Sequence, residues 1–107
     1  MSGANTPGPR PAQECEDLAE IRAAIDGIDR GILTALRNRL DYVRAAGRFK
    51  RNHDEVRAAE RVKSMLAERR AWAEQLDLDP DWIEEVYRVL IDGFIRLELK
   101  QVEETRG

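Results

Sequence analysis

Three charged side chains lie where the spacing of apolar residues predicts a buried helix face, and together they could bind an anion. Arg39 continues a seven-residue apolar spacing that begins at Leu18. Lys50 follows eleven residues later, about three helical turns, so both cations are expected to point to one side of the same helix. Glu98 has apolar neighbours at helical spacing on its own segment, so it is expected to be paired with a cation or protonated.

Each of these residues also has a purely structural interpretation. Arg39 could form a salt bridge with a protein carboxylate, and Glu98 could be the partner of an arginine. Lys50 could simply stabilise the carboxyl end of a helix. Arg22 and Arg61 have no evident role in their local patterns, and the adjacent Arg69 and Arg70 are expected to be ordinary solvated charges.

The remaining side chains argue against several other kinds of chemistry. Cys15 is the only cysteine and His53 the only histidine, so an internal disulfide is excluded and a zinc site of the usual ligand number is not expected. A Ser-His-Asp mechanism is also disfavoured. We expect no metal and no cofactor, and a reaction that depends on arginine, lysine and carboxylate groups.

Composition indicates one soluble domain of 107 residues, with 36% charged and 42% apolar residues. The net charge of −3 argues against a partner that is a nucleic acid, and there is no apolar run long enough to span a membrane. Residues 1–13 are rich in proline and glycine and are interpreted as a disordered leader before a helical domain at 14–107. Without an apolar signal stretch, we expect a cytoplasmic protein.

Helical periodicity accounts for almost all of the domain and predicts an all-α fold of three helices, long, short and medium. They are expected at about residues 17–51, 58–76 and 80–104, with an exposed loop at 51–57. Asp79 and Pro80 are expected to cap and begin the third helix. The first helix would be longer than a compact monomer of this size and carries two apolar stripes, so we predict an intertwined homodimer.

The sequence resembles the all-helical chorismate mutase family, and particularly its isochorismate pyruvate-lyase branch, which makes salicylate in salicylate and siderophore pathways. The resemblance covers about residues 14–107. The segments that carry it are LAEIRAAIDGID (18–29), RLDYVRAAGRFK (39–50), AERV (59–62), ERRAWAE (68–74) and ETRG (104–107).

This resemblance implies a homodimer with shared active sites for a small dicarboxylate, isochorismate or chorismate. Arg39 and Arg61 would bind substrate carboxylates, and Arg22 would enter from the partner chain. Lys50 would contact the ether oxygen whose C–O bond breaks, and Glu98 would contact the same oxygen or the adjacent carboxylate. Loop 51–57 would close over the bound substrate.

Two positions distinguish the branches of the family. Val62 stands where mutases of this family carry a glutamate, which favours the lyase. Glu98 stands where the lyases carry glutamine, which implies that its carboxyl is protonated when the dianion binds and that activity is higher in acid. The alternatives are a chorismate mutase or a 4-amino-4-deoxychorismate mutase. A further alternative is a non-catalytic helical dimerisation module in which Arg39 is paired with Glu98.

Overall fold

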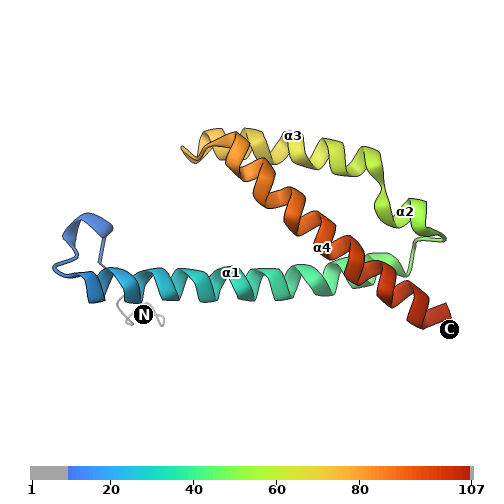
Figure 1. Ribbon diagram of the computed structural model, residues 1–107, viewed down its shortest axis with the longest axis horizontal. Coiled ribbons are helices and arrows are strands. Elements are labelled where there is room, and N and C mark those ends of the chain that lie inside the picture. The colour runs from blue at the N-terminus through green and yellow to red at the C-terminus, as the bar shows by residue number, and fades with distance from the viewer. Residues whose placement is uncertain (1–9, 107) are drawn as a thin grey trace, which may run out of the picture. The chain divides into compact units, whose positions relative to one another are not determined.

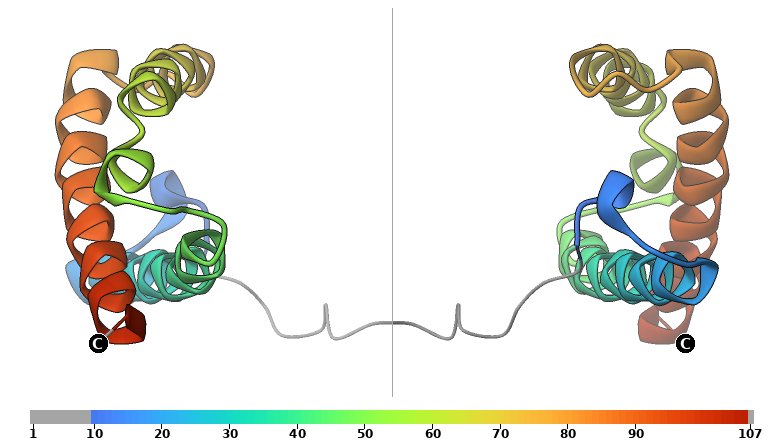
Figure 2. Two further views of the ribbon diagram at one scale, coloured as in Figure 1. Left: turned by 90° about the vertical axis from the view of Figure 1, so that its right-hand side faces the viewer. Right: turned by 90° about the vertical axis from the view of Figure 1, so that its left-hand side faces the viewer.

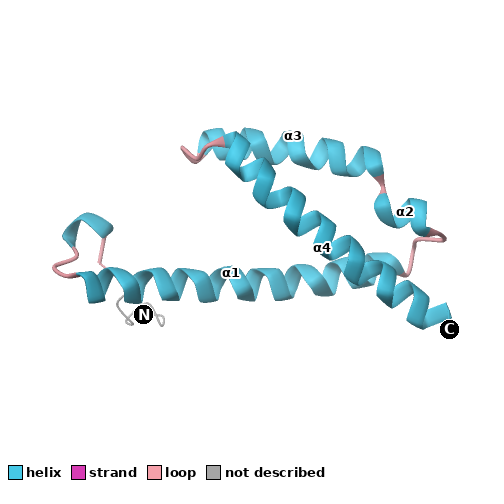
Figure 3. Cartoon of the chain, in the orientation of Figure 1, coloured by secondary structure: helices cyan, strands magenta, loops and turns pink. Residues whose placement is uncertain are grey.

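The computed structural model describes residues 10–106, with the side chains of these residues other than 55, 56, 102, 105 and 106. It contains three long helices, α1 (Leu18–Gly47), α3 (Ala59–Gln75) and α4 (Pro80–Arg106), and the short helix α2 (His53–Arg57) (Figure 1). No strand occurs within residues 10–106 (Figure 3), and the predicted all-helical fold with three main helices is confirmed. Most of the predicted leader lies outside the described residues, and Ala12–Glu14 form a 3₁₀ helix.

The chain divides into two units within α1, after Asn38. In the first unit, the Asp17 carboxylate caps α1 by accepting a hydrogen bond of 2.8 Å from the Glu20 backbone N–H. Six large apolar side chains of this unit are between 38% and 66% exposed, although they lie at the spacing of a buried helix face. They are Leu18, Ile21, Ile25, Ile28, Ile32 and Leu33.

The first helix ends at Gly47 and not near residue 51 as the sequence predicted. The chain leaves α1 through three successive i→i−3 hydrogen bonds, in which the N–H groups of Arg48, Phe49 and Lys50 donate to carbonyls. Gly47 favours this end because glycine is a poor helix former. Lys50 therefore lies in the connection after α1, and the prediction that it closes this helix is wrong.

The connection at 51–57 is not wholly a loop, because residues 53–57 form α2. A sharp turn at Ala58 separates α2 from α3, with φ of 41° and ψ of 61° in the left-handed region. This conformation is rare for a residue with a side chain and costs about 1 kcal/mol. The turn allows both Arg57, which ends α2, and Arg61, in the first turn of α3, to line one cavity.

Helices α3 and α4 form a hairpin, close together at the turn that joins them and divergent away from it (Figures 1 and 2). Pro80 begins α4, and Asp79 caps it by accepting a hydrogen bond of 2.9 Å from the Asp81 N–H, as predicted. Before this cap, Asp77 is in the left-handed region with φ of 60°, which turns the chain back. The core between the helices consists of Met65, Leu66 and Ile91, with Val62, Tyr87 and Ile95 packed against it.

Arg70 joins the two arms of the hairpin at the surface. Its guanidinium lies 2.9 Å from Asp81 and 3.0 Å from Glu84. Hydrogen bonds from Arg88 and Arg70 lower the pKa of the Glu84 carboxyl. Among the described residues, no helix is long and apolar enough to cross a membrane.

Candidate active site

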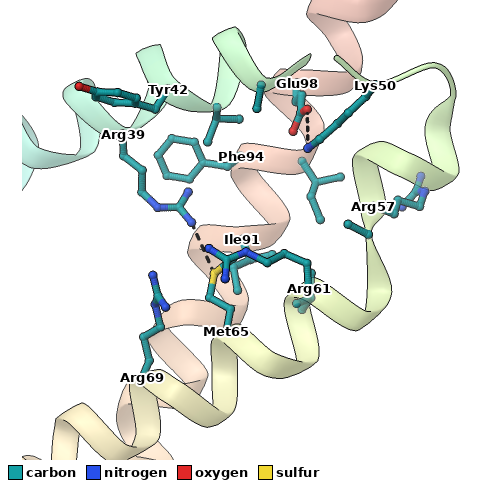
Figure 4. Close-up of a pocket in the computed structure, with 15 residues that line it drawn as sticks. Arg39, Tyr42, Lys50, Arg57, Arg61, Met65, Arg69, Ile91, Phe94 and Glu98 are labelled. Carbon is teal, nitrogen blue, oxygen red and sulfur yellow. Dashed lines mark hydrogen bonds and ion pairs between the residues drawn. The ribbon is translucent and has the colours of Figure 1, made fainter. Parts of the chain in front are cut away.

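A cavity of about 310 Å³ lies within the second unit, between the last turns of α1, the α2–α3 junction and α4. Its wall includes apolar side chains of the core, Val62, Met65, Ile91 and Phe94 among them. Its charged lining residues are Arg39, Lys50, Arg57, Arg61, Arg69 and Glu98 (Figure 4). Four of the five predicted site residues are thus brought together, although they come from distant parts of the sequence.

The Lys50 ammonium and the Glu98 carboxylate form an ion pair at one end of the cavity (Figure 4). Lys50 Nζ lies 2.8 Å from Glu98 Oε2. The Glu98 side chain is only 4% exposed, whereas that of Lys50 is 26% exposed. Glu98 Oε2 accepts no hydrogen bond of normal geometry, so the contact is mainly electrostatic. Glu98 is therefore paired with a cation, as one interpretation of the sequence required, but this cation is a lysine rather than an arginine.

Arg39 is held in a different way, by a ring and a sulfur atom. Its guanidinium carbon lies 4.5 Å from the centroid of the Phe94 ring, and Nη2 lies 3.7 Å from the Met65 sulfur. Within the described part of the chain, no carboxylate lies within ion-pair distance of this guanidinium. The pairing of Arg39 with Glu98, on which the non-catalytic alternative was based, does not occur.

Electrostatics at Arg39 reveal an excess of positive charge. Burial lowers the pKa of the Arg39 guanidinium, the interaction with Tyr87 opposes this, and the charges of Arg69 and Arg61 lower the pKa further. Arginine nevertheless stays charged at any pH at which the protein is folded. Its lowered pKa thus identifies a cation that would gain from an anionic ligand.

Two of the charged residues that line the cavity were not among the predicted site residues. Arg57 borders the cavity from the end of α2, where an exposed loop was expected. Arg69 was expected to be a solvated charge, but its side chain is only 16% exposed. A signal for Arg69 is present in the sequence, because Arg61, Met65 and Arg69 follow one another at intervals of four and share one face of α3. Arg22 lies exposed on α1 in the first unit.

This arrangement is suited to binding a compound with two carboxylates and to stabilising negative charge as it develops. Guanidinium groups bind carboxylates through two parallel hydrogen bonds, which fix the orientation of the ligand. An ammonium group such as that of Lys50, which lines the cavity, can stabilise an oxygen atom on which negative charge builds up. Such a site promotes a reaction by selecting one conformer of the substrate.

Comparison with known proteins gives a consistent result. Residues 21–99 match the family model described as chorismate mutase type II. The chain belongs to the chorismate mutase type II family. It is accordingly an enzyme of the chorismate mutase type.

Relatives of this chorismate mutase type II chain carry several names. It is 44% identical over 95 residues to an isochorismate pyruvate lyase of Pseudomonas aeruginosa, and the aligned region covers 89% of this chain and 94% of that protein. It is 30% identical over 93 residues to a 4-amino-4-deoxychorismate mutase of Streptomyces pristinaespiralis, and the aligned region covers 86% of this chain and 72% of that protein. A T-protein of Enterobacter agglomerans is 40% identical over 73 residues, 67% of this chain but only 20% of the T-protein.

Proposed function

We propose that the protein is an isochorismate pyruvate-lyase that converts isochorismate to salicylate and pyruvate. The observation that carries this choice is the 44% identity with an isochorismate pyruvate lyase over nearly the whole of both chains. The cavity supports the choice through Val62, which presents an apolar side chain where the mutases resembled by this sequence carry a glutamate.

In this reaction the ether C–O bond of the substrate breaks, and a hydrogen from the ring moves to the methylene carbon of the leaving enolpyruvyl group. The products are pyruvate and an aromatic ring, and no side chain has to accept or donate a proton. Arg39 and Arg61 bind the two carboxylates and hold the enolpyruvyl arm over the ring. Lys50 stabilises the ether oxygen as it acquires negative charge.

The Lys50–Glu98 contact gives this mechanism a pH dependence. An ionised Glu98 repels the substrate dianion and also engages the ammonium group that the ether oxygen needs, at 2.8 Å. We infer that the Glu98 carboxyl takes up a proton when substrate binds. Lys50 can then turn to the substrate, while the protonated carboxyl donates a hydrogen bond to the substrate oxygen.

A chorismate mutase is the second candidate. It is favoured by Glu98, which stands where the lyases resembled by this sequence carry glutamine, and by the relative named 4-amino-4-deoxychorismate mutase. The same cations would serve a rearrangement in which the ether C–O bond breaks and a C–C bond forms within one molecule.

We also propose that two copies of the chain form the enzyme and share their active sites. The exposed apolar face of α1, from Leu18 to Leu33, supports this proposal, since a monomer would leave it in water. In such a dimer Arg22, which is exposed on the same helix, completes the site of the partner chain.

A paired assay tests the activity. The purified protein is supplied separately with isochorismate and with chorismate, and salicylate fluorescence and the loss of chorismate absorbance are followed. Salicylate as the dominant product supports the lyase. Prephenate as the only product would show that the protein is a chorismate mutase instead. If neither substrate is converted, both proposed activities are refuted.

Mixing two inactive variants tests the shared site. If Arg22 acts in the partner's site, then unfolding and refolding an equal mixture of R22A and R39A chains restores about a quarter of the sites, because each mixed dimer has one intact site. Each variant refolded alone is the control. Activity that stays at the level of the controls would contradict a shared site, and sedimentation of the wild type as a monomer would contradict the dimer itself.

A further inference from the structure

Arg69 lines the cavity and is more buried than Arg57 and Arg61, but the proposed mechanism gives it no role. Its side chain, on the inner face of α3, is 16% exposed. Figure 4 shows it beside Met65, on the side of the cavity where the guanidinium groups of Arg39 and Arg61 also lie. Three guanidinium groups therefore converge on one region, from two different helices.

The surroundings of Arg69 fix its guanidinium rather than neutralise it. The guanidinium carbon lies 4.4 Å from the centroid of the Trp72 ring and 5.6 Å from that of Tyr87. Nη1 lies 2.7 Å from a carboxylate oxygen of Glu68, whose side chain is half exposed, so this pair is screened by water. Nε is buried and has no hydrogen-bond acceptor. An arginine held in this way on aromatic rings is ready to receive a ligand at its remaining edge.

The charges of the described side chains that line the cavity are unbalanced. Among the charged lining residues whose side chains are described, Glu98 is the only carboxylate, and it is already paired with Lys50. The charge of Arg69 acts on Arg39, because it is one of the causes that lower the pKa of Arg39. Within the described part of the chain, no protein carboxylate lies within ion-pair distance of Arg39 or Arg61. Mutual repulsion of these cations is a cost that a doubly charged ligand removes.

We infer that Arg69 is a further substrate-binding residue, whose guanidinium binds the same carboxylate of the substrate as Arg39. This inference rests on the proposed function and extends it, because it assigns one substrate carboxylate to a pair of arginines from α1 and α3. Because the Trp72 ring contacts the Arg69 guanidinium, its fluorescence should change when the anion binds. Arg61 remains for the second carboxylate, so the site should bind dicarboxylates more tightly than monocarboxylates of the same size.

Kinetics of three variants test the inference. In R69Q, KM for isochorismate should rise roughly 10- to 100-fold while kcat changes little, since a hydrogen bond to a charged group is lost in both the bound and the transition state. R69K, which keeps the charge but not the two parallel donors, should recover only part of the loss. R70Q is the matched control, because the neighbouring Arg70 contacts Asp81 and Glu84 outside the cavity, and its KM should stay at the wild-type value.

A binding measurement separates this inference from the proposed reaction. In a W82F background Trp72 is the only tryptophan, and benzene-1,3-dicarboxylate should change its fluorescence at concentrations where benzoate does not. The change should disappear in R69Q/W82F and persist in R70Q/W82F. Far-UV circular dichroism checks that each variant is folded, and if R69Q is not, R69K/W82F takes its place and should show weakened binding.

The outcomes are distinct. If R69Q and R69K turn over isochorismate with the KM of the wild type and bind the dicarboxylate equally well, the inference is wrong and the lyase assignment is unaffected. If the wild type produces no salicylate but binds the dicarboxylate in an Arg69-dependent way, the lyase assignment is wrong and Arg69 remains part of the anion site.

Discussion

Replacing Lys50 with methionine should lower the free energy of unfolding by about 3 kcal/mol, because it leaves a buried carboxylate without its counter-charge. Two unit charges 2.8 Å apart attract each other by about 6 kcal/mol at an effective dielectric constant of roughly 20. The desolvation of the two ions opposes this attraction by several kcal/mol, so the net contribution of the intact pair is small.

The two members of the pair should respond unequally, because they differ in burial. Glu98 is 4% exposed and cannot reach water when Lys50 is removed, whereas Lys50 is 26% exposed and can. E98Q should therefore cost only about 1 kcal/mol. The double variant K50M/E98Q should be more stable than the sum of the single losses implies, with a coupling energy of about 2 kcal/mol.

Urea unfolding followed by circular dichroism, at one protein concentration and neutral pH, measures all four corners of this cycle. R96M is the matched control, since Arg96 pairs with Asp92 on the exposed face of α4 and should change stability by no more than about 0.5 kcal/mol. A coupling energy below about 0.5 kcal/mol between Lys50 and Glu98 would refute the buried ion pair and the pH mechanism built on it.

Three other predictions concern the site and its framework. R39A should remain within about 1 kcal/mol of wild-type stability, since burial and the neighbouring cations already disfavour this charge. Its kcat/KM should fall by about 10²- to 10³-fold. Thermal melts measure the stability and steady-state assays the activity, and a stable, fully active variant would contradict the role proposed for Arg39. E98Q should raise kcat/KM at neutral pH by about tenfold or more, because it removes a charge that repels the dianion. The activity of the wild type should increase as the pH falls, whereas that of E98Q should not. The pH profiles of the two proteins test this, and identical profiles would count against protonation of Glu98. A58G should leave the free energy of unfolding unchanged or raise it by up to about 1 kcal/mol, because glycine adopts the left-handed turn without strain. The control A67G, in the middle of α3, should lower it by about 1 kcal/mol. Equal losses in urea unfolding would show that the turn at residue 58 is not strained.

Much of the framework followed from local patterns in the sequence. The repeat of apolar residues predicted the helices because side chains three and four positions apart share one helix face whatever the rest of the chain does. The cap at Asp79 and the start at Pro80 were predicted for a similar reason, since both depend on a few neighbouring backbone groups. The end of the first helix was predicted less well. Gly47 and the tight hydrogen bonds after it stop the helix, although the apolar repeat continues to Phe49.

Arg39, Lys50 and Glu98 were selected from the sequence because a charge on an apolar face is costly to bury without a partner, and all three line one cavity. The sequence by itself thus determined the helices and the kind of charged side chain that lines the cavity. Only the tertiary structure decided which charges meet. Helices α2 and α3 both pack against α4, and in this arrangement Lys50 lies beside Glu98 while Arg39 lies among other cations. Such pairings depend on contacts between residues far apart in the chain, which a helical repeat does not encode. The spacing of Arg61, Met65 and Arg69 places Arg69 on the inner face of α3, but its contacts with the Trp72 and Tyr87 rings in the cavity wall are seen only in the tertiary structure.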